Sequence, residues 1–435
     1  MRRSEVYSAS VIALSLASSV ENIAANMAMS YFPYYTVSLG AEMWFLGAFV
    51  AAFLIPNAFL SSPLGSLSDR IGRKKTIQAG LIADIFLGTA TGLVPNWQSL
   101  LILRAVNGTA TAAVRPAAEA SLVDQVPESR RGEAMGFFMT ATLIGWFVGP
   151  IFGGTVQFLS QTSLGLPLED SYRVPYFMDS FLSVIALVLV NRKVRETRGE
   201  GISQKKSKRT NEEDIRLTGS ILRSVRVLYL SEMTNGFAVG FIAPVGVLFL
   251  GAAFGAIPFQ IGTILSLSGF VGVLCNFFAG KLADMWGRKP LIAIGGLSSR
   301  LAAFILPHTP DLWQATGVMA IRSLGLNVAM PASRALRADL VPQQIRGKLF
   351  GKFAALFDVG MVAGSLLGPW LFDTFKYEEI MIEWLGGLTF KGIGTTFYLS
   401  GTMGLISLAL LLVFVKEPQR RKTLEESAEP LGSIC

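Results

Sequence analysis

The sequence predicts an all-α polytopic membrane protein with twelve transmembrane helices, arranged as two pseudo-symmetric six-helix bundles. Three observations support this fold class: an apolar composition, twelve long apolar stretches, and a repeat that relates the two halves. Hydrophobic residues make up 51% of the 435 positions and charged residues only 16%, whereas a soluble domain carries about 25% charged residues. The 30 Phe and 7 Trp exclude an intrinsically disordered chain.

The apolar stretches are long enough to cross a lipid bilayer. A spanning helix needs roughly 20 mostly apolar residues, because each residue advances about 1.5 Å through about 30 Å of hydrocarbon. The first stretch follows two arginines, as a signal peptide would, but it is too long and carries Glu21, so we expect it to remain as a helix. The twelve stretches are 8–36, 43–66, 76–94, 98–122, 134–160, 174–191, 221–250, 257–282, 291–308, 312–338, 350–372 and 393–415.

The basic residues are distributed unevenly between the two sides of these stretches. They gather at the N-terminus, in alternate loops and at the C-terminus, whereas the opposite loops offer only Arg173, Lys376 and Lys391. The positive-inside rule therefore predicts a multi-pass protein of the cell membrane with both termini in the cytoplasm. The net charge of +8 reflects this topology and does not indicate nucleic-acid binding.

One long polar segment separates the two groups of six helices. It contains a basic run at 205–209 and an acidic run at 212–214. We therefore expect four regions: an N-terminal six-helix bundle (1–191), a cytoplasmic linker (192–219), a C-terminal six-helix bundle (220–415) and a cytoplasmic tail (416–435).

The two halves of the chain repeat each other. Residues 65–74 recur as 280–289, and the same offset of 215 relates Pro116 to Pro331 and Asp124 to Asp339. With an offset of 211, Glu21 and Pro33 match Glu232 and Pro244. A duplicated six-helix unit implies a pseudo-two-fold axis, with a binding site where the halves meet.

These motifs resemble those of the major facilitator superfamily. Residues 65–75 resemble its loop 2–3 signature, and 280–290 resemble the second copy. Residues 104–108 are similar to its helix 4 motif, with Asn107 where Gln is commoner, and 145–154 to the helix 5 motif of proton-coupled antiporters. The resemblance spans all twelve helices. It implies transport by alternating access, with helices 1, 4, 7 and 10 around a central cavity.

The loop motif also has a physical interpretation. Gly65 permits close approach of two backbones. Asp69 can accept from helix N-terminal amides or pair with an arginine, and Arg73 can bridge to Asp124 or Asp358. Such contacts serve either as a conformational latch, which the resemblance favours, or as a static anchor. The second copy of the motif supplies Gly280, Asp284 and Arg288.

Four charged residues lie midway along the helices that the resemblance places around the cavity. Glu21 and Glu232 match each other, as do Arg104 and Arg322. A charge at the bilayer centre costs about 2.5–3.5 kcal/mol, so it normally has a partner or faces water. A buried carboxylate can bind and release a proton, whereas an arginine supplies a countercharge or binds an anion. We expect these four residues to couple protons or bind substrate, with Glu21 approaching Arg104 and Glu232 approaching Arg322; static ion pairs are the alternative.

Polar residues extend this candidate cavity. A period of 3.6 places Arg104, Thr111 and Arg115 on one stripe of the fourth helix. The sequence leaves open which face of the first helix looks into the cavity. The polar positions that we include are Asn22, Asn107, Thr111, Arg115 and Asn235.

The helix 5 motif is rich in small residues. They permit tight helix contacts, and its proline bends the helix, so the motif serves either generic packing or a seal between the halves. Its residues are Gly145, Gly149, Pro150, Gly153 and Gly154. Asp84 and Arg300, on the peripheral helices 3 and 9, are expected to be structural partners.

The sequence offers no support for a cofactor or an enzyme active site. Two cysteines and one histidine argue against a metal site, and no phosphate-binding Lys loop supports ATP-driven transport. The leading hypothesis is a monomeric secondary transporter that exports hydrophobic or amphipathic small molecules in exchange for protons. The alternatives are a proton-coupled importer or exchanger of an organic anion, with Arg104 and Arg322 as its clamp, and a non-transporting receptor or membrane enzyme.

Overall fold

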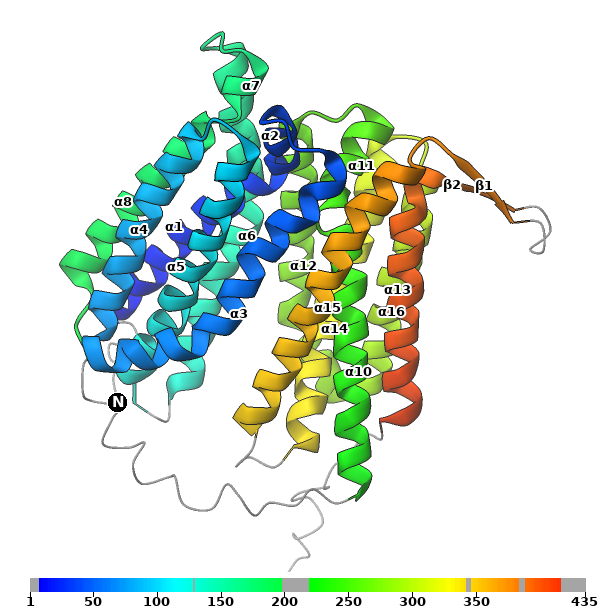
Figure 1. Ribbon diagram of the computed structural model, residues 1–435. Helices are drawn as coiled ribbons and strands as arrows, with labels where there is room; N and C mark the ends of the chain where they lie inside the picture. Colours follow the sequence, from blue (N-terminus) through cyan, green and yellow to red (C-terminus); the bar gives the residue numbers. More distant parts are fainter. Residues whose placement is uncertain (1–7, 128–129, 198–218, 342–345, 383–387, 416–435) are drawn as a thin grey trace, which may run out of the picture.

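A computed structural model describes residues 8–127, 130–197, 219–341, 346–382 and 388–415, which form two helical bundles side by side (Figure 1). The N-terminal bundle contains α1 (Ala9–Met27), α2 (Phe32–Ser38), α3 (Leu46–Ile71), α4 (Arg73–Leu93), α5 (Trp97–Asp124), α6 (Arg131–Thr162), α7 (Leu168–Ser171) and α8 (Val174–Lys193). The C-terminal bundle contains α10 (Gly219–Ile242), α11 (Val245–Phe254), α12 (Pro258–Trp286), α13 (Arg288–Ile305), α14 (Leu312–Leu340), α15 (Arg346–Phe375) and α16 (Thr395–Phe414).

The helices of membrane length agree with the predicted spans. Ten helical segments among the described residues are long and apolar enough to cross a membrane. The long helices α5 and α14 are not among the ten, because polar and charged residues along each of them lower its hydropathy. Both nevertheless run alongside the other helices of their bundles (Figure 1), which gives the twelve expected helices.

The first helix of each bundle is broken near a proline. Pro33 lies in the first turn of α2, after a short 3-10 turn that follows α1. Pro244 lies between α10 and α11. Proline lacks the backbone N–H that a continuing helix needs, but it is accepted at a helix start. The sequence predicts continuous helices over 8–36 and 221–250, so the structure corrects both while preserving the repeat.

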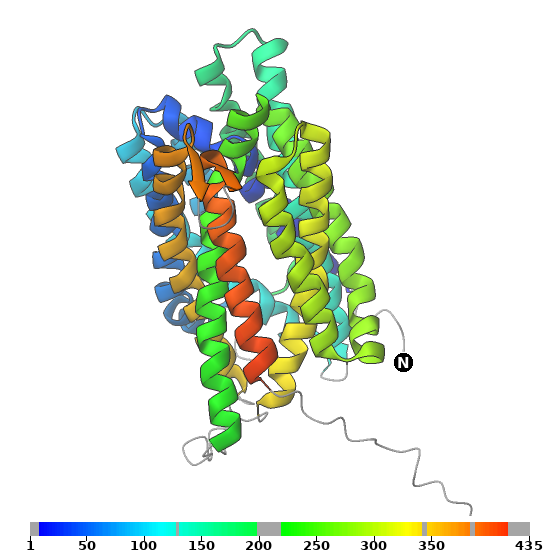
Figure 2. The same cartoon turned by 90° about the vertical axis from the view of Figure 1, so that its right-hand side faces the viewer.

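A short β-hairpin is an addition to the all-α prediction. Strands β1 (Glu379–Ile382) and β2 (Leu388–Lys391) pair antiparallel, with Glu379 opposite Lys391 and Ile382 opposite Leu388. The hairpin projects from the same end of the molecule as α7, which both ribbon views show (Figures 1 and 2). We call this the hairpin end. The opposite end, where α4 and α13 begin with the loop motifs, is the loop-motif end.

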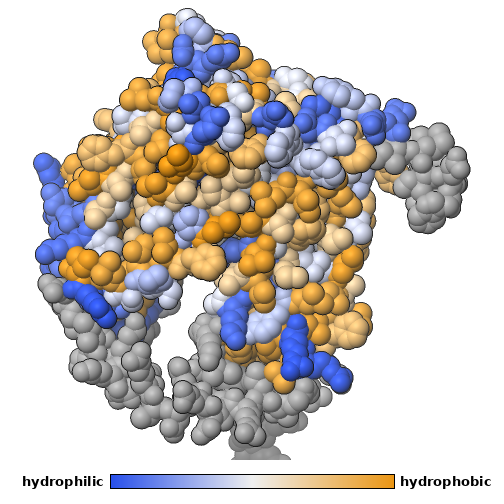
Figure 3. All heavy atoms as spheres, in the orientation of Figure 1, coloured by the Kyte–Doolittle hydropathy of each residue, from blue (hydrophilic) through white to orange (hydrophobic). Residues whose placement is uncertain are grey.

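The two bundles meet at the hairpin end and separate at the loop-motif end. Near the hairpin end, the Tyr34 hydroxyl donates to the Val247 carbonyl (3.3 Å). Gly47 of α3 also lies directly against the Ser365 carbonyl of α15. At the loop-motif end the surface is hollowed between the bundles (Figure 3). The molecule is therefore open on the side where the loop motifs lie.

Candidate functional site

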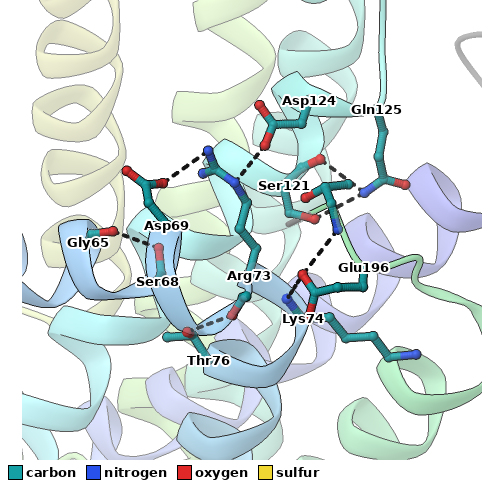
Figure 4. Close-up of polar contacts among 12 residues, drawn as sticks. Gly65, Ser68, Asp69, Arg73, Lys74, Thr76, Ser121, Asp124, Gln125 and Glu196 are labelled. Atoms are coloured by element: carbon teal, nitrogen blue, oxygen red, sulfur yellow. Dashed lines mark hydrogen bonds and ion pairs between the residues drawn. The ribbon is translucent and has the colours of Figure 1, made fainter. Parts of the chain in front are cut away.

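Arg73 joins three helices of the N-terminal bundle at the loop-motif end. Its guanidinium lies 3.1 Å from Asp69 at the end of α3 and 2.6 Å from Asp124 at the end of α5 (Figure 4). Of the two acids that the sequence offers as partners, the structure thus selects Asp124 and not Asp358. The Arg73 and Asp124 side chains are only 12% and 11% exposed, so this pair is well shielded from salt.

The same contact recurs in the C-terminal bundle. Arg288 at the start of α13 pairs with Asp339 near the end of α14. These two residues are related to Arg73 and Asp124 by the offset of 215, so the ion pair follows the sequence repeat. The surroundings of Gly280 and the side chain of Asp284 lie outside what the structure describes.

A carboxylate from the segment after α8 caps the first loop motif. Glu196 accepts a hydrogen bond from the backbone amide of Lys74 at the start of α4 (3.3 Å; Figure 4) and another from the amide of Lys75 (3.4 Å). Gly72 has a φ of +117°, and a Cβ at this position would lie 2.6 Å from a Glu196 carboxylate oxygen. Glu196 is not among the site residues predicted from the sequence. Its signal was an acid that follows a helix near a cluster of bases.

We expect Asp69→Asn to slow the transport cycle while leaving folding nearly unchanged. The substitution weakens one contact of Arg73, whereas the shorter contact with Asp124 remains. The measurement is turnover in proteoliposomes beside the thermal unfolding temperature. Glu133→Gln is the matched control, because Glu133 forms a more exposed ion pair with Arg130 at the same end (2.9 Å). Unchanged turnover in Asp69→Asn would favour the static anchor.

Glu21 lies inside the N-terminal bundle. It lines a small cavity with Leu81 of α4, Val114 and Ala118 of α5 and Val190 of α8. The structure does not pair it with Arg104 as expected. The Arg104 guanidinium instead lies over the rings of Phe32 and Phe53, 4.7 Å and 5.1 Å from their centroids, where cation–π attraction partly offsets its burial.

Two further carboxylates, those of Asp84 and Asp179, lie between α4 and α8. Ser183 donates to Asp84 (3.1 Å), and the Asp179 carboxylate lies against Gly88, where a Cβ would be 3.0 Å from it. Asp84 and Gly88 are one turn apart on α4, as are Asp179 and Ser183 on α8. Glu21 interacts electrostatically with both acids. Glu21, Asp84 and Asp179 therefore form one group, which we call the acid cluster.

Asp179 is not among the site residues predicted from the sequence. It lies within the apolar stretch 174–191, so the rule that identified Glu21 would also have found it. Asp84 was expected to be a structural partner, and the structure places it in the acid cluster. Arg104 is the arginine that interacts electrostatically with Asp179. Three carboxylates thus share the interior of this bundle with Arg104.

Glu232 has a different partner from the one expected. It is 8% exposed and pairs with Arg337 of α14 (3.1 Å), not with Arg322. The Arg337 guanidinium also lies over the ring of Phe353, 5.6 Å from its centroid. The charge of Glu232 is therefore balanced by that of Arg337 in this conformation.

Arg322 shares a pocket inside the C-terminal bundle with Arg300. Arg300 donates to the Asn235 side-chain oxygen (2.9 Å) and to the Ser299 hydroxyl (2.7 Å). Arg300, which is expected from the sequence to be a structural partner, thus lines a pocket and contacts Asn235 of α10. Arg104 lies over two phenylalanine rings of the N-terminal bundle, whereas Arg322 lines a pocket of the C-terminal bundle, so the two arginines occupy separate sites in this conformation.

The expected polar stripe of the fourth helix is divided between two environments. Its upper part is packed, because Gly108 lies directly against the Phe53 carbonyl of α3. Thr111 donates to the carbonyl of Asn107 (3.0 Å). Lower on α5, the Arg115 side chain is 77% exposed and pairs with Glu119 (3.2 Å). Arg115 also interacts electrostatically with Asp358 of α15, in the other bundle.

The helix 5 motif packs α6 against α1 of its own bundle and against α12 of the other bundle. Gly145 and Gly149 lie against Asn22 and Asn26 of α1. This face of α1 is therefore covered by a helix, whereas Glu21 faces the interior of the bundle. Gly154 lies against Pro258 of α12, and the Ser266 hydroxyl accepts from the amide of Ile151, which follows Pro150 (3.0 Å). Gly153 lies against Met27 of α1, as Gly145 and Gly149 lie against α1. The motif thus contributes to the contact between the bundles as well as to packing within the N-terminal bundle.

Comparison with known proteins agrees with this geometry. The sequence profile of the Major Facilitator Superfamily matches residues 14–231 and 228–434. Similar curated proteins include the Multidrug resistance protein MdtG of Citrobacter koseri, 26% identical over 381 residues (85% of this chain and 89% of that protein). The protein of the same name from Salmonella arizonae is 26% identical over 379 residues (85% and 90%).

Solved structures share the fold. A bacterial homologue of the human lysosomal transporter Spinster, in an inward-facing and unoccupied conformation, has a TM-score of 0.72 with 16% identity and covers 95% of this chain and 98% of its own. A D-xylose-proton symporter has a TM-score of 0.73 with 16% identity (94% and 98%).

Proposed function

Because the chain belongs to the major facilitator superfamily, we propose that it is a secondary transporter that exports hydrophobic or amphipathic small molecules in exchange for protons. Alternating access between the two bundles is the mechanism, and the hollow at the loop-motif end is the opening in the conformation described here (Figure 3). The multidrug relatives support export of apolar compounds.

The acid cluster carries the proton-coupling part of this proposal. Burial disfavours the charged form of a carboxylate, and a nearby arginine favours it. Arg104 acts electrostatically on Asp179, and Arg115 acts on Glu21, so the protonation of these carboxylates is sensitive to the positions of the two arginines and to the access of water. Rocking of one bundle against the other changes the access of water to the acid cluster, whereas Arg104 stays in the same bundle as the three acids. A proton bound in one conformation is then released in the other.

Transport against a gradient tests this function. Proteoliposomes with an acidic interior are expected to accumulate an amphipathic dye, because protons leaving through the protein drive the dye inward. A protonophore should abolish the accumulation. Liposomes without protein are the control for passive uptake of the dye. Accumulation only with an alkaline interior would indicate symport. No accumulation under either gradient, with lipophilic cations, neutral amphiphiles and anionic amphiphiles all tried, would overturn the proposal.

The loop-motif end is proposed to face the cytoplasm, with both termini and the 192–219 linker on that side of the cell membrane. The basic loops support this orientation through the positive-inside rule. Protease added to right-side-out vesicles should leave 192–219 intact and should reach the outer loop 372–392. Cleavage within 192–219 from outside would contradict the orientation.

A further inference from the structure

A polar pocket lies inside the C-terminal bundle, away from the acid cluster. Four helices line it: α10, α13, α14 and α16. Its polar side chains are Asn235, Ser299, Arg300, Arg322 and Ser400. Small and apolar residues, among them Ala238, Ala303 and Leu326, complete the wall.

The groups that accept hydrogen bonds from Arg300 in this pocket carry no charge. The oxygens that accept from Arg300 belong to Asn235, Ser299 and the Gly296 backbone, and all are neutral. Among the residues that the structure describes, neither Arg300 nor Arg322 forms an ion pair. Glu232, one turn from Asn235 on α10, is already bound to Arg337.

The two arginines also act on each other. Arg300 is the charged group that acts electrostatically on Arg322, and like charges repel. Arginine cannot give up its proton to relieve the repulsion. Two like charges held at membrane depth without a counterion are costly, and such residues normally mark a substrate or ion site.

The helix opposite Arg300 leaves room for its side chain. A Cβ on Gly404 of α16 would lie 2.8 Å from the Arg300 Cγ and 2.9 Å from its Nε. Arg300 therefore crosses α16 at a glycine, which lets the guanidinium reach Asn235 within the pocket. The chain accommodates this arginine inside the bundle rather than directing it to a bundle surface.

We propose that Arg300 and Arg322 bind the oxyanion, a carboxylate or a phosphate, of an amphipathic substrate. Guanidinium groups form short, charge-assisted hydrogen bonds with such oxyanions, often two at a time. Asn235 fixes the position of Arg300, and the apolar wall contacts the adjoining part of the ligand. This assignment rests on the proposed function only in taking the ligand to be a transported molecule.

Direct binding tests the pocket without any gradient. Octanoate and octyl phosphate are titrated calorimetrically into the full-length protein in nanodiscs of neutral lipid, beside octyltrimethylammonium as the cationic probe. Arg322→Gln and Arg300→Gln are each expected to weaken binding of at least one anion by about tenfold or more, and to leave the cation unaffected. The ratio of the affinities for octanoate and octyl phosphate shows whether the pocket prefers a carboxylate or a phosphate. Arg226→Gln, at an exposed site on α10, should bind like the parent.

Two outcomes would overturn the assignment. One is equal anion affinity in Arg322→Gln, Arg300→Gln and Arg226→Gln. The other is a clearly lower unfolding temperature of ligand-free Arg322→Gln, because loss of an uncompensated charge should leave stability equal or raise it, whereas loss of a structural residue should lower it. Failure of proton-driven transport alone would count against the proposed function and leave the anion binding in place.

Discussion

Gly47→Ala is expected to reduce transport by about tenfold or more by preventing the two bundles from closing at the hairpin end. In this conformation Gly47 of α3 lies directly against the Ser365 carbonyl of α15, so an added Cβ would overlap the backbone of the other bundle. Overpacking of this kind typically costs 1–3 kcal/mol. The cost applies only when the bundles meet, so it shifts the protein toward the conformation that is open at the hairpin end.

The shift can be measured as a distance. Spin labels at Ser163, after α6, and Ala253, in α11, occupy exposed positions on different bundles. Gly47→Ala should lengthen the distance between them while the unfolding temperature stays near that of the parent. Gly153→Ala is the contrasting variant, because its Cβ would overlap α1 within the same bundle and should lower stability instead.

Gly317→Ala completes the comparison. A Cβ at this exposed position of α14 would meet no atom within 4 Å. Neither the distance between the two spin labels nor the unfolding temperature should therefore change. If Gly47→Ala keeps the parent distance and the parent turnover, the contact between α3 and α15 does not control the conformational equilibrium.

The sequence predicts the helices well because lipid imposes a length on them. Each span must bury about 20 residues, and the loop motifs repeat at a fixed offset. The pair between Arg73 and Asp124, and its copy between Arg288 and Asp339, follow from that repeat. The breaks at Pro33 and Pro244 were visible as matched prolines, but their effect depends on whether the helix continues beyond them.

Partners of the intramembrane charges are less predictable. Glu232 could reach α14 at several heights, and the choice of Arg337 over Arg322 depends on how the two helices are tilted and rotated. Hydrophobic periodicity gives the apolar face of a helix, but in a bundle several faces are covered. For this reason Asp84 and Arg300 were assigned to structural roles, although both lie with other polar groups inside their bundles.

Glu21→Gln is expected to abolish proton-driven accumulation and to leave substrate binding largely intact. Glutamine keeps the size of the protonated acid but cannot release a proton. The acid cluster then no longer changes its charge between conformations, so the gradient is uncoupled from the movement of the bundles. Because Glu21 has Asp84 and Asp179 as acidic neighbours, removing its charge should not lower the unfolding temperature.

Glu232→Gln should behave differently, which separates the two matched acids. It leaves the Arg337 side chain, 14% exposed, without its carboxylate. Breaking a buried pair from one side costs about 3–5 kcal/mol. A lower unfolding temperature is therefore expected for Glu232→Gln. Asp373→Asn is the control for removal of a carboxylate outside the acid cluster. Asp373 pairs with Lys376 at the hairpin end (2.7 Å).

The pH dependence of substrate binding gives the sharpest measurement on Glu21. In exchange transport, substrate and proton favour opposite conformations, so the parent should bind substrate more weakly as the pH falls through the range in which the acid cluster takes up its proton. Glu21→Gln should remove that dependence and bind with one affinity across the range. Asp179→Asn should reduce it, because Asp179 interacts with Glu21. If both variants keep the parent pH profile and still accumulate substrate against a gradient, the coupling proton binds outside the acid cluster, and Asp358 of α15 becomes the next residue to replace.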